Sequence, residues 1–381
     1  MKRVAIFSVT YHPFIGGAEV AIKEFTARLP EYVFDLYAAK LDDSLPDVEH
    51  MGNVTVYRVG TGRRLFDKWL YPWGAARLAL MHHHQNPYDL IHAVLETYAG
   101  VAALLFKKRE PKVPYLLTMQ SGDSDWFIRL RTWFWYPWYR QVFTRADKIT
   151  AISFWLKDRA KGYGTKEEDI EIIPNAVDER FLEIGSPQER ARVRSSWGVR
   201  DQDIVVITAS RLVRKNGVDT LIDAMERVPE NAKLVIAGTG ADERSLKSRA
   251  KRFGNRVLFL GHIGHDILPA LLRSADIFVR ASRSEGLGNA FIEARAAGLA
   301  VIGTPVGGIN DLIKAGIVEP AEGNAAAIAE KIASAVRSAG GAASPERGRG
   351  RIREQYSWDV VARQYGDEYK KLLTAEHVSS N

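Results

Sequence analysis

The segment IFVRASRSEGLGNAFIE, residues 277–293, contains an apolar run, a turn with two glycines and a helix-forming continuation. Residues 277–279 have the β-branched and aromatic composition of a buried strand. Gly286 and Gly288 follow closely, and glycine adopts backbone geometries that strain other residues. We therefore predict a strand, a tight loop and a helix that starts near Gly288, which together form one βα unit of a parallel sheet.

The same alternation of short β-rich runs and longer helical patterns extends over almost the whole chain. It predicts an α/β fold with two doubly wound parallel sheets, and 381 residues suit two domains of this size. We expect an N-terminal domain at residues 1–185 and a C-terminal domain at residues 186–356. The terminal helix, within residues 357–381, is expected to pack back on the N-terminal domain.

The predicted strands fall into two groups separated by a polar helix at residues 187–197. The first group is 4–9, 33–38, 54–59, 90–94, 115–119, 149–152 and 170–173; the second is 204–209, 234–237, 257–260, 277–279 and 301–302. Residues 338–351, rich in Gly, Ala and Arg, are predicted to form a surface loop.

The composition excludes several classes of protein. Without cysteine there is no disulfide framework, thiolate metal site or cysteine nucleophile. No apolar stretch approaches the roughly 20 residues of a spanning helix, and the first one ends by Val9, so we expect a cytoplasmic protein. Residues 58–145 contain 13 Lys and Arg against 6 Asp and Glu, an excess equal to the net charge of +7. This regional charge suits an anionic partner, which could be nucleic acid, lipid head groups or phosphorylated substrates.

The glycine turn at 286–288 has the properties of a phosphate-binding loop. A helix that starts there directs its first N–H groups and its positive dipole end at an anion. Asn289 and Glu293 share one helix face, whereas Glu285 lies on the other side of the turn. Two carboxylates would then flank a diphosphate and could bind ribose and sugar hydroxyls. The alternative is structural, with Glu293 an exposed helix residue and Glu285 a helix cap.

A second polar segment, SRLVRKNG at residues 210–217, follows the first predicted strand of the C-terminal domain. Ligands of open α/β sheets bind at the carboxyl ends of strands, so Arg211 and Lys215 are placed to neutralise a diphosphate. The alternative is a solvated basic loop.

Together, these two segments resemble the retaining, GT-B-fold glycosyltransferases of the sucrose-synthase-like family, glycosyltransferase family four. The resemblance covers nearly the full chain and includes five further motifs: Gly16-Gly17-Ala18-Glu19, Pro174-Asn175-Ala176-Val177-Asp178, Gly238-Thr239-Gly240, Gly307-Gly308-Ile309 and Tyr356-Ser357-Trp358.

The resemblance implies two Rossmann-like domains facing a cleft, the first binding the acceptor and the second the nucleotide sugar. It also implies that Glu285 contacts the donor sugar, that Glu293 contacts the ribose, and that Arg211 with a nearby lysine contacts the diphosphate. Further donor contacts are implied for Gly288, Asn289, Ala290, Gly16, Gly17, Asn175 and Gly238, and acceptor or sugar contacts for His12, Gln120 and Asp123.

Two positions depart from the family pattern. The family usually has lysine directly before the glycine that is Gly217 here, whereas this chain has Asn216 there and Lys215 one place earlier. The fifth strand of relatives often leads into a His-Gly pair, but this chain has Gln120 after that strand.

No metal ion or other cofactor is expected. The pairs Asp123/Asp125 and Asp201/Asp203 have the spacing of metal-binding acids, but 46 acidic residues produce such pairs by chance and a basic diphosphate site makes a metal unnecessary. The tract at 82–84 has three histidines, which would point in different directions from a helix. The Gly238 turn lacks the third glycine of a dinucleotide fingerprint, and no P-loop motif occurs.

The expected activity is transfer of a hexose-type sugar from a nucleotide-diphosphate donor to a glycan or lipid-linked acceptor, in the synthesis of a cell-surface polysaccharide or glycolipid. The resemblance implies that anomeric configuration is retained. Nucleic acid is not an expected partner. The alternatives are an epimerase or phosphorylase of the same fold, and a non-catalytic protein that binds sugar or nucleotide.

Two aromatic and basic segments, 63–77 and 126–140, lie inside the region that carries the net charge. Trp and Tyr favour the lipid head-group boundary, so these segments predict docking at the anionic inner face of a membrane. In the alternative, the aromatic residues form a packing core or an acceptor groove. Pro72 and Pro137 are expected to interrupt any continuous amphipathic helix.

Overall fold

The computed structural model describes residues 1–14, 16–124, 126, 128, 130, 133, 136–338 and 345–378. The chain forms two compact units. Unit 1 is Met1–Asn175 together with Trp358–Asn381, and unit 2 is Ala176–Ser357. Each unit is an α/β domain built on one mainly parallel sheet. The predicted fold class is confirmed.

In the part of unit 1 that the structure describes, the sheet has eight strands in the order β3-β4-β2-β1-β5-β6-β7-β8. Most of them are apolar runs, because helices cover both faces of a parallel sheet. In chain order they are β1 Lys2–Phe7, β2 Tyr32–Ala39, β3 Val48–Met51, β4 Val54–Val59, β5 Leu90–Val94, β6 Tyr115–Met119, β7 Lys148–Ala151 and β8 Ile170–Ile172.

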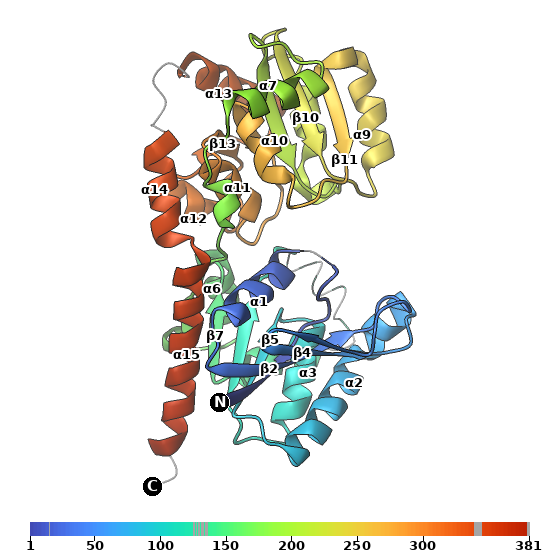
Figure 1. Cartoon of the computed structure of the whole chain (residues 1–381), viewed down its shortest axis with the longest axis vertical. Helices are drawn as coiled ribbons and strands as arrows, with labels where there is room; N and C mark the ends of the chain where they lie inside the picture. The colour runs from blue at the N-terminus through green and yellow to red at the C-terminus, as the bar shows by residue number, and fades with distance from the viewer. Residues whose placement is uncertain are drawn as a thin grey trace. The chain divides into compact units, whose positions relative to one another are not determined.

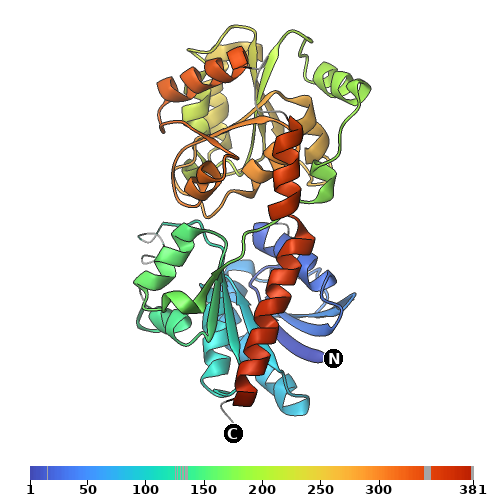
Figure 2. The ribbon, with the colours of Figure 1, turned by 90° about the vertical axis from the view of Figure 1, so that its left-hand side faces the viewer.

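The α-helices of unit 1 are α1 Gly17–Ala27, α2 Arg64–Gln85, α3 Tyr98–Lys107, α5 Tyr136–Thr144, α6 Phe154–Gly162 and α15 Trp358–Val378. Although α15 comes from the end of the chain, it packs beside α1 and contacts β5 (Figure 2). Its Tyr369 hydroxyl lies 2.8 Å from Nδ1 of the fully buried His92 in β5. The last helix is therefore part of the core of the first domain.

In the described residues of unit 2 the sheet has six strands in the order β11-β10-β9-β12-β13-β14. They are β9 Ile204–Ala209, β10 Ala232–Ala237, β11 Val257–Gly261, β12 Ile277–Arg280, β13 Ala300–Gly303 and β14 Glu319–Pro320. This is the 3-2-1-4-5-6 order of a Rossmann sheet, in which the first and fourth strands are neighbours and ligands bind beyond their carboxyl ends. The switch point, which is the place where the strand order reverses direction, lies between the neighbouring strands β9 and β12.

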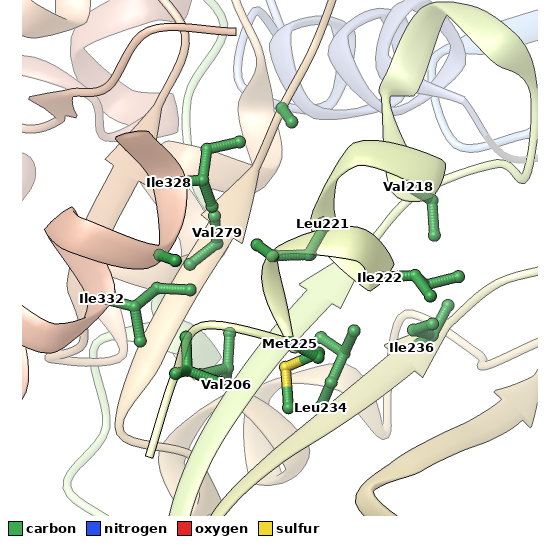
Figure 3. Close-up of a cluster of buried hydrophobic side chains, with 14 of the residues drawn as sticks. Val206, Val218, Leu221, Ile222, Met225, Leu234, Ile236, Val279, Ile328 and Ile332 are labelled. Atoms are coloured by element: carbon green, nitrogen blue, oxygen red, sulfur yellow. The ribbon is translucent and has the colours of Figure 1, made fainter. Parts of the chain in front are cut away.

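The helices in the described part of unit 2 are η3 Glu179–Phe181, α7 Pro187–Ser196, η4 Arg214–Asn216, α8 Val218–Ala224, α9 Glu243–Ala250, η5 Lys251–Arg256, α10 Leu268–Ser274, α11 Asn289–Ala296, α12 Ile309–Lys314, α13 Ala325–Ser338 and α14 Pro345–Gln355. A core of aliphatic side chains joins α8 and α13 to the sheet (Figure 3). In it, Leu221 and Met225 pack with Val206 of β9 and Ile332 of α13. This packing holds the first strand at the switch point.

Several predicted boundaries differ from the structure. The contacts divide the chain after Asn175, not after residue 185, because Val177 pairs with Ser357 and Phe181 packs against His265, all within unit 2. Residues 345–351 of the predicted surface loop belong to α14, which packs on α11, and residues 339–344 lie outside the described part.

Two strands were not predicted, and one proline was misinterpreted. Strand β3 is half polar and pairs antiparallel with β4, and β14 has only two residues. Pro72 lies inside the 22-residue helix α2 without ending it, because neighbouring Tyr71 is buried and its hydroxyl donates to the Tyr37 carbonyl (2.9 Å). Pro137 lies in the first turn of α5, where its missing N–H has no cost.

Candidate active site

Most of the predicted donor residues of unit 2 lie in the loops that follow β9 and β12, the two strands at the switch point, or in helix α11 directly after the second loop, whereas Gly238 follows β10. The loops fit closely: the Arg283 amide donates to the Lys215 carbonyl at 2.7 Å. Gly217 has a φ of +65°, and a Cβ there would be 1.7 Å from the Ala281 carbonyl oxygen. Any other residue at Gly217 would separate the loops. The two segments on which the resemblance is based, at residues 210–217 and 282–293, therefore lie together at the carboxyl-end edge of the unit 2 sheet.

Asn216, which replaces the expected family lysine, links the two loops. It is buried; its Nδ2 donates to the Arg211 carbonyl at 2.6 Å, and its Oδ1 accepts from Arg280 Nη2 at 2.9 Å. Lys215 is half-buried, whereas Arg211 is exposed and forms no ion pair with the residues described. Asn216, directly after Lys215, is thus a neutral, structural residue.

Glu285 is fixed by Arg280, the last residue of β12. Arg280 Nη2 lies 2.7 Å from Glu285 Oε2, and the two side chains are only 11% and 15% exposed. The Gly286 amide donates to Glu285 Oε1 at 3.3 Å. A strand end and a glycine amide therefore orient this carboxylate at the switch point. The sequence analysis did not single out Arg280. The signal that could have indicated it is a charged residue at the end of an apolar strand.

Helix α11 begins where the sequence predicted. Gly288 has a φ of +92° and occupies the N-cap without a side-chain cap. The amides of Asn289 and Ala290 lie in the first turn, where N–H groups have no carbonyl partner inside the helix. With the positive end of the helix dipole, this is a site that favours an anion.

Two more loops with glycines, at Gly238 and Gly307, pack against the loops that follow β9 and β12. A Cβ at Gly307 would be 2.0 Å from the Glu285 carbonyl, and one at Gly238 would be 1.9 Å from the Ser210 carbonyl. Close backbone packing therefore accounts for both glycines, and a donor contact of Gly238 stays a prediction. The buried hydroxyls of Ser210 and Ser282, which follow β9 and β12, have no hydrogen-bond partner among the described residues.

Glu293 lies one turn into α11 and has a partner that the sequence did not indicate. Its Oε1 is 3.3 Å from Nε2 of His265, which lies in the loop after β11. The hydrogen bond to Glu293 raises the pKa of His265, although burial opposes the shift. Nothing in the local sequence pattern distinguished His265 from the neighbouring His262.

The remaining predicted residues belong to unit 1. His12 is exposed, its carbonyl accepts from Arg58 Nη2 at 2.9 Å, and Gly16 is the N-cap residue of α1, which starts at Gly17. Asn175 Nδ2 donates to Gln120 Oε1 at 3.2 Å. These residues lie near the carboxyl ends of β1 and β6, and their substrate contacts stay predictions.

A buried acid and a buried arginine, Glu96 and Arg159, which were not predicted, lie beneath the loop that carries Asp123. Arg159 of α6 donates to the carbonyls of Ser121 and Asp123 at 3.2 and 2.6 Å. Its Nη1 is 3.7 Å from the fully buried Glu96, which follows Leu95, a residue with a φ of +79°. Burial raises the pKa of Glu96 to about 7.

Of the residues that were weighed as metal ligands, Asp203 and the three histidines have other partners. Asp203 is buried and pairs with Arg200 at 2.9 Å, and Asp125 lies outside the described residues. Of the three histidines, His82 contacts Tyr37, whereas His83 and His84 both lie near the Glu110 carboxylate, at 3.9 and 3.2 Å, and His83 also accepts from the Tyr88 amide. In the described ranges, no group of three or more potential ligands could hold a metal ion.

The chain matches two family models that together span most of its length. The model "Glycosyl transferases group 1" matches residues 189–348, and "Glycosyltransferase Family 4" matches residues 15–181. They cover most of unit 2 and of unit 1, respectively.

Three known proteins illustrate the similarity. An uncharacterized glycosyltransferase of Methanocaldococcus jannaschii is 27% identical over 333 residues, 82% of this chain and 83% of that protein. The GDP-mannose-dependent monoacylated alpha-(1-6)-phosphatidylinositol monomannoside mannosyltransferase of Corynebacterium glutamicum is 28% identical over 252 residues, 62% and 64% of the two chains. Sucrose-phosphate synthase of Thermosynechococcus elongatus has the same fold, with a TM-score of 0.82 and 22% identity over 98% and 100% of the two chains.

The fold and the matched families define the class: this protein is a glycosyltransferase with the GT-B fold. Within that class the chain is a family-four-like glycosyltransferase, so the resemblance seen in the sequence is confirmed.

Proposed function

We propose that this enzyme transfers a hexose, with retention of configuration and without a metal ion, from a nucleoside-diphosphate sugar to a glycan or lipid-linked acceptor. The observation that carries the proposal is the position of Glu285 in the loop after β12, where Arg280 holds it shortly before the helix that favours an anion. We place this reaction in the synthesis of a cell-surface polysaccharide or glycolipid.

The chemistry follows from the charges at this edge. The departing nucleoside diphosphate gains negative charge, which the amide groups of Asn289 and Ala290 and the side chains of Arg211 and Lys215 would stabilise. Glu285 would accept hydrogen bonds from sugar hydroxyls and fix the anomeric carbon. The bond to the acceptor oxygen would form on the face that the diphosphate leaves, and a diphosphate oxygen would take the acceptor proton. The rate acceleration would then come from positioning the donor and acceptor and from stabilising the departing diphosphate.

The reaction is tested by incubating the enzyme with GDP-mannose or UDP-glucose and lipid or glycan acceptors. We expect release of free nucleoside diphosphate that persists in EDTA, and a product with the donor's anomeric configuration by NMR. Inversion would contradict the retaining mechanism, and loss of turnover in EDTA would contradict metal independence. Binding without nucleotide release would favour the non-catalytic alternative, and release of a free epimerised sugar would favour an epimerase.

Membrane docking of unit 1 is the second part of the proposal, and helix α2 supports it. Phe66, Trp69 and Trp73 lie on one face of α2 and are 58%, 48% and 39% exposed, with Arg63 and Arg77 exposed nearby. In the second segment Trp126, Trp133, Tyr136 and Trp138 are also exposed, whereas Phe127, Arg131, Phe134 and Trp135 lie outside the described residues. Exposed aromatic and basic side chains favour an anionic lipid surface. None of the described helices is long and apolar enough to cross a membrane.

Sedimentation with vesicles tests this docking. We expect binding to phosphatidylglycerol vesicles at low salt, weaker binding at high salt, and little binding to phosphatidylcholine. The double variant Trp69→Ser, Trp73→Ser should lose vesicle binding. The control Phe154→Ser removes an aromatic side chain of α6 that is 56% exposed and should bind as the wild type does. If the double variant instead binds vesicles normally but raises the acceptor KM, α2 forms an acceptor groove.

A further inference from the structure

His265 is held on two sides within unit 2. Its Nε2 lies 3.3 Å from Oε1 of Glu293, and the ring of Phe181 packs against the imidazole with centroids 5.2 Å apart. The His265 and Glu293 side chains are 26% and 13% exposed. The contacts join three elements that are distant in the sequence, namely η3, the loop after β11, and α11.

The charged groups around His265 favour its protonated form. The Glu293 carboxylate makes the largest contribution, Asp178 adds to it, and Arg180 acts against it, as does burial; the net result is a raised pKa. Arg180 is paired with Asp178 at 2.7 Å, which partly offsets its charge. Because its pKa is raised, His265 forms an ion pair with Glu293 up to a higher pH than an unperturbed histidine would, and this ion pair is stronger than a hydrogen bond from a neutral imidazole.

We propose that His265 is a positioning residue that fixes the Glu293 carboxylate for the ribose hydroxyls of the donor, so that donor affinity depends on the charge of His265. The inference rests on the proposed function, in which Glu293 contacts the ribose. An ionised carboxylate offers about four acceptor sites, and His265 occupies one, so enough remain for two ribose hydroxyls. A carboxylate held in advance loses less conformational entropy when the donor binds.

The direction of the pH dependence follows from the raised pKa. His265 is charged below its unperturbed pKa of about 6.5 and loses the charge as the pH rises through the higher value in the folded protein. Glu293, Asp178 and Arg180 face the imidazole, and acids and arginine ordinarily keep their charge between pH 6 and 9. Donor affinity should therefore fall across this window, by about fivefold if a charged hydrogen bond becomes a neutral one.

The first experiment needs no ligand. NMR titration of the wild-type histidines, with His265 assigned through the variant His265→Gln, should give a pKa above 6.5 that falls in Glu293→Gln. A wild-type value at or below 6.5, or one that Glu293→Gln leaves unchanged, overturns the inference.

The second experiment measures the Kd of GDP-mannose and of UDP-glucose by calorimetry at pH 6 and pH 9. We expect the wild-type Kd to rise about fivefold with pH, the Kd of His265→Gln to be high at both pH values, and kcat to change little. His262→Gln removes an exposed histidine from the same loop and should behave as the wild type. If the wild type binds the donor with a Kd that depends neither on pH nor on His265, the inference is overturned but the proposed donor site is not. If neither nucleotide sugar binds the wild type, both the inference and the proposed donor site fail.

Discussion

Glu285 and Glu293 have different partners at the edge of unit 2, and this difference predicts different kinetic defects. Glu285 is paired with Arg280 beside the predicted sugar position, whereas Glu293 is paired with His265 one turn into α11. We expect Glu285→Gln to lower kcat by about 100-fold or more, because an interaction with the reacting sugar is lost. Glu293→Gln should instead raise the donor KM about tenfold with a smaller effect on kcat. Steady-state kinetics with a saturating acceptor separate the two effects.

The variant Glu243→Gln is a control, because Glu243 lies on α9 and its ion pair in the described part of the chain is with Lys247, one turn away in the same helix. It should leave both kcat and KM unchanged. Normal turnover in Glu285→Gln would show that the Glu285 carboxylate is not required for the reaction.

Residue types and spacing predicted the glutamates and the glycine turn, because these carry local chemistry. The partners of the glutamates could not be predicted in the same way. Arg280 meets Glu285 only when the end of β12 is placed against its own loop, and His265 meets Glu293 only when β11 and α11 occupy one domain. Asn216 had appeared as a departure from the family pattern, and its buried hydrogen bonds show that it joins the loops.

At the scale of elements, α15 is attached to unit 1 by a buried hydrogen bond between Tyr369 and His92. Tyr369→Phe leaves Nδ1 of His92 without this partner in the core, and we expect it to lower the free energy of unfolding by about 1–3 kcal/mol. Urea denaturation followed by circular dichroism measures the change. The control Thr374→Val removes an exposed hydroxyl that donates, among the described residues, to the carbonyls of Lys370 and Lys371 in the same helix, and it should cost less than about 0.5 kcal/mol. Equal losses would mean that His92 does not anchor the helix.

Hydrophobic periodicity predicted the elements that are apolar on both faces and missed those that are not. The runs at 90–94 and 115–119 match β5 and β6 because central parallel strands are continuously apolar. Edge strand β3 has exposed, partly polar positions, so it resembled a loop. Helix α14 has glycine and arginine in a pattern typical of loops, but Arg349 donates to the carbonyls of Ala296 and Ala297 at the end of α11. That tertiary contact is invisible in the local pattern.

At the scale of the whole molecule, both sheets repeat one strand order. In unit 1 the strands β4-β2-β1-β5-β6-β7 follow the same 3-2-1-4-5-6 sequence as the six strands of unit 2, with β3 and β8 added at the edges. The switch point of unit 1 therefore lies between β1 and β5. Glu285 occupies the turn after the fourth strand of unit 2, and Glu96 occupies the corresponding turn of unit 1. The two acids differ in environment, since Glu96 is fully buried with Arg159.

The burial of Glu96 predicts how the stability of unit 1 depends on pH. Its pKa is about 7 in the fold against an ordinary value of 4.5, so the unfolded chain gives up this proton more readily. The stabilising contribution of the protonated acid is complete below about pH 4.5 and is lost as the pH rises through about 7. Relative to Glu96→Gln, which cannot titrate, the wild type should lose about 2 kcal/mol of unfolding free energy between pH 5.5 and pH 8. Urea denaturation at the two pH values measures this difference.

The control variant Glu31→Gln, at an exposed position of unit 1, should show no such pH dependence of its unfolding free energy relative to the wild type. A difference between wild type and Glu96→Gln that stays constant with pH would mean that Glu96 remains ionised beside Arg159.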